Sequence, residues 1–159
     1  MAAISVDVSV DLKLLKSDIR GTFDKARREA LIESLQGIQE AAQAAIRFRS
    51  KTHRLLQSVK YEVHGEDGEV YLDENVAPYA PYFHDGTGRY GERHRDIIIT
   101  PENGKALHWS EGGRQHFASR VISSGQPGEL FLYDAAAQYE NSVEQAYDKA
   151  VDKALKEVF

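Results

Sequence analysis

Apolar and polar residues alternate strictly near the start of the chain, over residues 4–12. The apolar positions are Ile4, Val6, Val8, Val10 and Leu12, and the residues between them are serine or aspartate. A period of two is typical of a strand that buries one face. We expect this segment to be an edge strand of the main sheet.

Two later segments follow the period of an α-helix instead. From Thr22 to Phe48 the apolar stripe consists of Phe23, Ala26, Ala30, Leu31, Leu35, Ile38, Ala42, Ala45 and Ile46. Over residues 132–158 it consists of Leu132, Ala135, Ala136, Tyr139, Val143, Ala146, Ala150, Ala154 and Val158. Each stripe predicts a long amphipathic helix with one packed face. Gly37 is the interior residue that weakens the first of these helices.

Shorter runs between the two predicted helices favour strands. Val59 to Leu72 alternates on either side of the turn residues 65–68, which predicts a hairpin. Further strands are expected at Ile97 to Ile99, Ala106 to Trp109 and Phe117 to Ile122, before the break at residues 123–128. The pattern predicts an α+β fold in a single domain, 1–159, with an antiparallel β-sheet covered by two long α-helices.

A glycine-rich and arginine-rich loop, Gly86 to Asp96, separates the hairpin from the later strands. It carries too little apolar surface for independent burial, so we expect a long mobile loop that a partner orders. Just before it, the aromatic residues Tyr79, Tyr82 and Phe83 are expected to pack a short helical turn onto the sheet. Trp109, on a short strand, is expected in the core.

Composition narrows the class of protein without selecting a function. The chain has 159 residues, of which 42% are hydrophobic and 28% charged, as in an ordinary globular domain. With no cysteine, disulfides, thiolate metal sites and cysteine nucleophiles are excluded. The formal net charge of -5 argues against general nucleic-acid binding. The sequence shows neither a membrane span nor an export signal, which favours cytoplasmic synthesis.

Three candidate chemistries can be written from the central residues. Gly86 to Gly91 matches the dinucleotide pattern G-x-G-x-x-G, but it neither follows an apolar strand nor opens a helix. The candidate nitrogen and oxygen metal ligands are His84, Asp85, His94, Asp96, His108 and His116. A triad of Ser110, His108 and Asp96 lacks a nucleophile elbow. Scattered surface histidines are the simpler interpretation, and the alternative is a metal-dependent nucleotide or phosphodiester enzyme that uses His84, Asp85 and His94.

A basic stretch follows the first predicted helix. It contains Arg47, Arg49, Lys51, His53 and Arg54. Cations at this end complement the helix dipole, so a solvated helix end accounts for them. The alternative is a nucleic-acid-binding module that uses this patch.

Taken together, these segments resemble a known family, the tail-completion or head-to-tail joining proteins of tailed bacteriophages. The most characteristic match is Tyr79 to Thr87, YAPYFHDGT, followed by the arginine-rich loop and a strand that ends at Pro101. Gly104 to Leu107, Gly125 and the Phe131-Leu132 pair match later parts of the family pattern in order and spacing.

The resemblance is weaker upstream. Thr52, Leu55, Ser58 and Val59 stand where the family usually shows Thr-Gly-x-Leu-Arg-x-Ser-Ile. His53 replaces the glycine, Leu56 replaces the arginine, and the usual preceding proline is missing. These departures concern the local turn.

The resemblance implies a structural virion protein, without catalysis or cofactor, that forms a ring at the head-proximal end of the tail. The ring is commonly a hexamer, made in the host cytoplasm and then part of the virion neck. The implied partners are other copies of the chain, head-completion or connector proteins, tail-tube or tail-terminator proteins, and DNA passing through the lumen. The expected assembly contacts are loop residues Asp85, Gly86, Thr87, Gly88, Arg89, Tyr90, Arg93 and Arg95, with arginine forks pairing with carboxylates of a neighbour.

Overall fold

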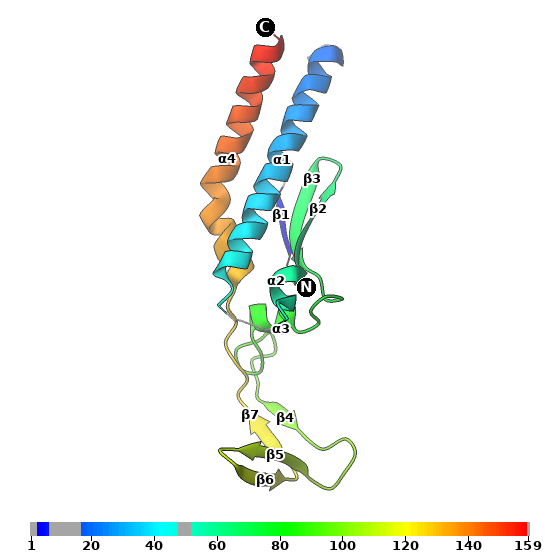
Figure 1. Cartoon of the computed structure of the whole chain (residues 1–159), viewed down its shortest axis with the longest axis vertical. Helices are drawn as coiled ribbons and strands as arrows, with labels where there is room; N and C mark the ends of the chain where they lie inside the picture. Colours follow the sequence, from blue (N-terminus) through cyan, green and yellow to red (C-terminus); the bar gives the residue numbers. More distant parts are fainter. Residues whose placement is uncertain (1–2, 7–16, 48–51, 159) are drawn as a thin grey trace. The chain divides into compact units, whose positions relative to one another are not determined.

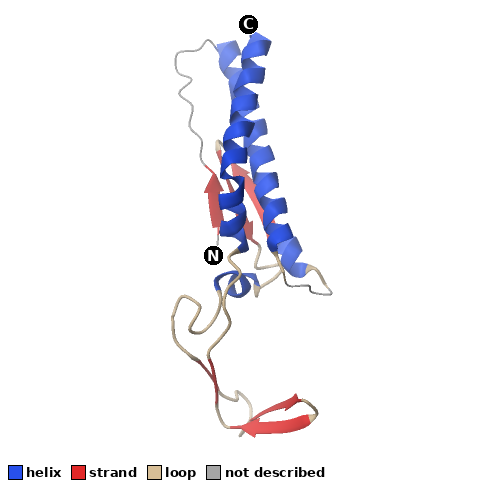
Figure 2. Ribbon diagram, turned by 90° about the vertical axis from the view of Figure 1, so that its left-hand side faces the viewer, coloured by secondary structure: helices blue, strands red, loops and turns tan. Residues whose placement is uncertain are grey.

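The computed structural model describes residues 3–6, 17–47 and 52–158. They belong to two compact units, one drawn from residues 1–81 and 130–159 and the other from residues 82–129. The fold is a mixed one, with long helices and small antiparallel sheets (Figures 1 and 2). That residues 1–159 form a single domain stays a prediction, and the chain contains two compact units.

Both predicted long helices are present in the first unit. They are α1, Ser17–Ala45, and α4, Phe131–Val158. They lie side by side and run antiparallel along most of their length (Figure 1). The first helix begins at Ser17 and not at Thr22, and Phe48 lies outside the described residues.

Most residues of the two predicted apolar stripes are buried or half-buried. The buried apolar side chains of α1 are Ala26, Ala30, Leu31, Leu35, Ile38 and Ala42, and those of α4 include Leu132, Ala135, Ala146 and Ala154. The glycine that weakens α1 has a packing role, because a Cβ atom at Gly37 would lie 2.2 Å from Cε1 of Tyr139. The absent side chain therefore makes room for an α4 ring.

Three antiparallel strands form the sheet of the first unit. They are β1, Ala3–Val6, β2, Val59–His64, and β3, Asp67–Leu72, in the order β1-β3-β2. The hairpin prediction is confirmed, with Val59 opposite Leu72. The edge-strand prediction is confirmed for β1, and the rest of that alternation, at Val8, Val10 and Leu12, lies outside the described residues.

The two helices do not cover this sheet equally. α1 packs against β2 and β3, whereas α4 packs mainly on α1 and reaches β1 (Figure 2). A Cβ atom added at Gly68 of β3 would lie 2.4 Å from Cδ1 of Leu35 in α1. The helix therefore approaches the sheet closely at this glycine. The expectation of one sheet covered by two helices holds only in part, since the other strands form separate sheets.

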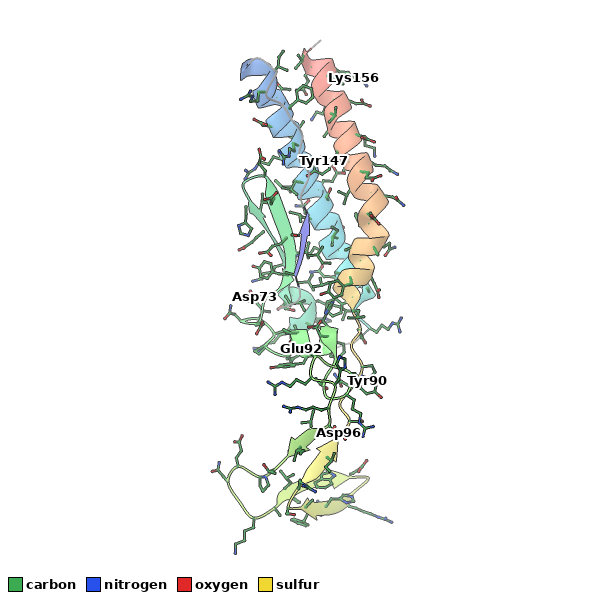
Figure 3. The ribbon with its side chains drawn as sticks, turned by 180° about the vertical axis from the view of Figure 1, so that it is seen from behind. Asp73, Tyr90, Glu92, Asp96, Tyr147 and Lys156 are labelled. Carbon is green, nitrogen blue, oxygen red and sulfur yellow. The ribbon has the colours of Figure 1, made fainter. Side chains whose placement is uncertain are left out.

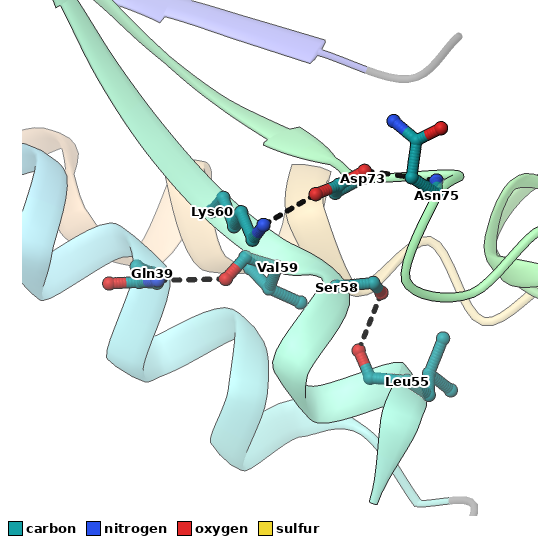
Figure 4. Close-up of polar contacts among 7 residues, drawn as sticks. All are labelled: Gln39, Leu55, Ser58, Val59, Lys60, Asp73 and Asn75. Carbon is teal, nitrogen blue, oxygen red and sulfur yellow. Dashed lines mark hydrogen bonds and ion pairs between the residues drawn. The ribbon is translucent and has the colours of Figure 1, made fainter.

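Polar contacts fix the lower end of the hairpin (Figure 4). The short helix α2, Arg54–Ser58, leads directly into β2. The side-chain amide of Gln39 in α1 donates to the Val59 carbonyl at 2.7 Å. At the end of β3, Asp73 accepts from Lys60 at 2.5 Å and from the Asn75 amide at 2.9 Å. The hairpin is thus tied to α1 and to the turn after it.

The second unit contains two separate two-stranded sheets. In one, β4, Ile97–Ile99, pairs with β7, Val121–Ser123. In the other, β5, Leu107–Glu111, pairs with β6, Arg114–Ala118. The prediction of one strand over residues 117–122 was wrong, because Phe117 belongs to β6 whereas Ile122 pairs with Ile98 in another sheet. The short helix α3, Ala80–Asp85, contains the boundary between the units.

Candidate interaction site

The predicted assembly loop is held by backbone pairing with a distant segment. The Thr87 amide donates to the Gln126 carbonyl and the Arg89 amide donates to the Ser124 carbonyl, both at 2.9 Å. The Gln126 amide in turn donates to the Thr87 hydroxyl at 3.1 Å. The first part of the loop therefore pairs with another backbone segment of the same chain, whereas we expected the loop to be ordered only by a partner. Mobility of the loop stays a prediction.

Glycine permits this pairing. A Cβ atom at Gly125, where φ is 82°, would lie 2.0 Å from the Thr87 carbonyl oxygen. One at Gly88, where φ is 64°, would lie 2.4 Å from the Ser124 carbonyl oxygen. Two backbone segments thus touch where no side chain fits. This contact gives Gly88, the second glycine of the G-x-G-x-x-G pattern, a structural reason, which the sequence did not reveal because Ser123 to Gly128 was interpreted only as a break.

An internal ion pair connects the two ends of the loop. Two guanidinium nitrogens of Arg89 reach the Asp96 carboxylate, with Nη2 at 2.9 Å from Oδ2 and Nε on Oδ1. Hydrogen bonding from Arg89 lowers the pKa of Asp96, and the same bond raises the pKa of Arg89. The Arg89 fork is therefore already occupied within the loop.

The other two arginines of the loop differ from Arg89. The side chains of Arg93 and Arg95 are exposed, and neither forms an ion pair with the residues that the structure describes. Tyr90 is 54% exposed (Figure 3). Asp85 and Arg89 are exposed as well, but each already binds another side chain, His84 and Asp96 respectively.

His84 is buried, and not a surface histidine as the sequence suggested. Its ring is fully buried, and Nδ1 lies 2.5 Å from the carboxylate of Asp85. The buried face of α3 is formed by Ala80 and His84, four residues apart. Tyr82 is 64% exposed and Tyr79, just before the helix, is 37% exposed, so the expected packing of these two tyrosines onto the sheet was wrong. Phe83 is half-buried, and its packing onto the sheet stays a prediction.

The candidate metal and catalytic residues are not gathered into one site. His94 has its Nδ1 at 3.3 Å from the Arg89 carbonyl oxygen, and His108 bonds to Gln115. Over the described residues, the group of possible ligands that does come together is Glu62, His64 and Glu69, on the hairpin of the other unit. Sequence reasoning missed this group, although the i, i+2 spacing of Glu62 and His64 in a predicted strand could have indicated it.

The second unit has apolar side chains but buries none of them. No apolar side chain is buried from Tyr82 to Glu129, a range that the structure describes throughout. The exposed large apolar residues on its strands are Ile97, Ile98, Ile99, Trp109, Phe117 and Ile122. Trp109 is 39% exposed and stacks on His116, so its expected place in the core was wrong. A two-stranded sheet has no second layer under which a tryptophan could be buried.

The basic stretch after α1 is described only in part. Arg49 and Lys51 lie outside the described residues, whereas Arg47, His53 and Arg54 are exposed. His53 stands immediately before α2 with φ at 51°, in the left-handed region. Binding of nucleic acid by this stretch stays a prediction.

No protein-family model, curated protein or solved structure matches the chain. Within the described part of the chain, none of the helices is long and apolar enough to cross a membrane.

Proposed function

We propose that the chain is a structural subunit of a tailed-bacteriophage neck, of the tail-completion or head-to-tail joining type. In this proposal it assembles with copies of itself into a ring, a hexamer, at the head-proximal end of the tail. Its neighbours are head-completion or connector proteins on one side and tail-tube or tail-terminator proteins on the other, with DNA passing through the lumen. It is made in the host cytoplasm, works without cofactor or catalysis, and ends in the virion.

One observation carries this proposal, namely the apolar surface that the second unit leaves exposed. Ile98 and Ile122 lie directly opposite each other on β4 and β7, and they are 61% and 56% exposed. Contiguous apolar surface of this kind is typical of interaction sites. A two-stranded sheet alone is marginally stable in water, so a neighbour that covers it would also stabilise it.

The local turn at His53 also supports the resemblance. The family pattern has glycine at this position, and the departure to histidine could have removed the turn. Instead His53 adopts the left-handed conformation, with φ at 51°, that glycine favours. Histidine is among the residues that tolerate this region better than most.

The loop would supply the polar part of the same contact. Arg93 and Arg95 are exposed, and their guanidinium groups pair well with carboxylates. With a net charge of -5, each copy carries more carboxylates than cations and so offers acidic partners to its neighbours. In a ring, each subunit presents one surface to the next subunit and binds the previous one through a different surface. The loop and the surface that binds it therefore need not resemble each other.

The test replaces the apolar pair in the phage that encodes the chain. Ile98→Lys with Ile122→Lys should leave the first unit folded and abolish production of infectious particles, with unjoined heads and tails visible by electron microscopy. The matched control is Leu155→Lys, which puts a lysine on an apolar residue of α4 that is 41% exposed. A normal titre of joined particles from the double variant would reject the proposal.

A further inference from the structure

We propose that Glu62, His64 and Glu69 form a binding site for a first-row divalent transition-metal ion such as Zn²⁺ on the outer face of the β2–β3 hairpin. The site belongs to the first unit and does not depend on the proposed function.

Strand geometry places the three side chains together. Glu62 and His64 are two residues apart on β2, so both point to the same face of the sheet. Glu69 lies directly opposite Glu62 on β3, in an antiparallel register that puts both carboxylates on that face. The other face carries Tyr61, which bonds to Gln36, and Gly68, which contacts Leu35 of α1. The three possible ligands therefore face away from α1.

The distances fit ligands of one ion better than direct ion pairs. Nε2 of His64 lies 3.5 Å from a carboxylate oxygen of Glu62 and 3.5 Å from one of Glu69. Charge-assisted hydrogen bonds of this type are shorter, about 2.7–2.9 Å. A tetrahedral zinc ion with bonds of about 2.1 Å holds neighbouring ligand atoms roughly 3.4 Å apart. The three ligand atoms all lie within 4.8 Å of one another, and exposed side chains can close the remaining gap by rotation.

Charge favours a cation at this point. Two glutamates directly opposite each other on neighbouring strands repel, which destabilises the pairing. Imidazole with two carboxylates suits zinc and similar metals, whereas Mg²⁺ and Ca²⁺ prefer oxygen ligands alone.

The experiment titrates Zn²⁺ into the full chain against a chromophoric chelator. We expect one ion per chain, with affinity reduced at least about tenfold by His64→Ala or Glu69→Gln. The control is His94→Ala, which removes an exposed histidine from the second unit and should bind as the unaltered chain does. Excess Mg²⁺ should not displace the zinc.

A second measurement keeps the test independent of misfolding. Zinc should raise the unfolding temperature of the unaltered chain and of His94→Ala, and should leave that of His64→Ala unchanged, while all three have the same helical circular dichroism. If His64→Ala has lost helical circular dichroism, Glu62→Gln is used in its place. Equal zinc affinity in the unaltered chain and the hairpin variants, or no saturable binding by the unaltered chain, would overturn the proposal.

Discussion

Gly37 has no side chain, and this lets α1 approach the Tyr139 ring of α4 closely. At Gly37 of α1, a Cβ atom would stand 2.2 Å from Cε1 and 2.6 Å from Cζ of Tyr139. Helix propensity alone favours alanine over glycine in a helix interior, by about 1 kcal/mol. The clash of the added methyl group with the Tyr139 side chain opposes the gain in helix propensity. Overpacking of this kind costs about 1–3 kcal/mol. The contact should therefore determine the sign of the effect.

We predict that Gly37→Ala lowers the free energy of unfolding by up to about 2 kcal/mol, because the cost of displacing the Tyr139 ring exceeds the gain in helix propensity. In the background of Tyr139→Ala, the same change should raise it by about 1 kcal/mol, because only helix propensity remains. Urea unfolding of the four proteins measures both effects. The same sign in both backgrounds would show that the helices do not meet through this ring.

Gly125 is the glycine that contacts the loop Gly86 to Asp96. Gly125 and Gly113 both have positive φ, 82° and 79°, but a methyl group added at Gly125 would meet backbone atoms within 4 Å, whereas one added at Gly113 would meet open space. Gly125→Ala should therefore break the pairing of Thr87 and Arg89 with the segment at 124–126. Gly113→Ala should show only backbone strain.

Amide hydrogen exchange at Thr87 and Arg89 measures this difference, because both amides donate across the contact. Exchange should accelerate strongly in Gly125→Ala and stay near that of the unaltered chain in Gly113→Ala. Equal protection in the two variants would mean that the loop does not rely on this contact.

At the scale of elements, the β2–β3 hairpin depends on the residue that follows it. The Asp73 amide donates to the Ser58 carbonyl at 2.7 Å, and its carboxylate binds Lys60. The hydrogen bond from Lys60 is the main cause that lowers the pKa of Asp73 and raises that of Lys60. Because the folded-state pKa of Asp73 is depressed, the pair stabilises the fold above the unfolded-state pKa, about 3.9. That stabilisation is lost as the pH falls through the lower folded-state value.

We predict that Lys60→Met raises the pKa of Asp73 toward its ordinary value and makes stability less dependent on pH below about 4. An NMR titration of the Asp73 carboxyl carbon, with urea midpoints at acidic and neutral pH, measures both. The control is Lys25→Met, which removes an exposed lysine 4.0 Å from Glu29 within α1 and should not move the Asp73 pKa. An unchanged pKa in Lys60→Met would contradict this interpretation of the pair.

Most of the elements that the sequence predicted correctly have a hydrophobic period that repeats over many residues. Both long helices, the hairpin and the strand at Ile97 to Ile99 were expected and are present. The contact of Gly88 with Gly125 was not, because it joins two backbones far apart in the chain and leaves no side-chain pattern. The burial of His84 and the exposure of Trp109 were also missed, since a residue type gives only a tendency toward the core.

For the molecule as a whole, the apolar core belongs to one unit alone. Every buried apolar side chain among the described residues lies between Ala26 and Ala80 or between Phe131 and Ala154. The second unit, residues 82–129, contributes none of them. Hydrophobic burial is the main favourable term in folding, so the first unit should fold without the second.

We predict that replacing residues 82–129 by a flexible glycine-serine linker preserves the first unit. Circular dichroism should show the helix content of α1 and α4, and thermal unfolding should stay cooperative. The matched comparison is Leu35→Ala in the unaltered chain, which opens a cavity beside the sheet and should cost about 2–5 kcal/mol. Loss of cooperative unfolding in the linker variant would show that the core needs the second unit.

The order of the elements along the chain has a consequence for biosynthesis. α4 is the main packing partner of α1, yet the whole second unit is translated between them. A nascent chain on the ribosome therefore exposes the apolar stripe of α1 until residues 131–158 have emerged. Polypeptides released before α4 is made would lack the main packing partner of α1 and would remain open to proteases.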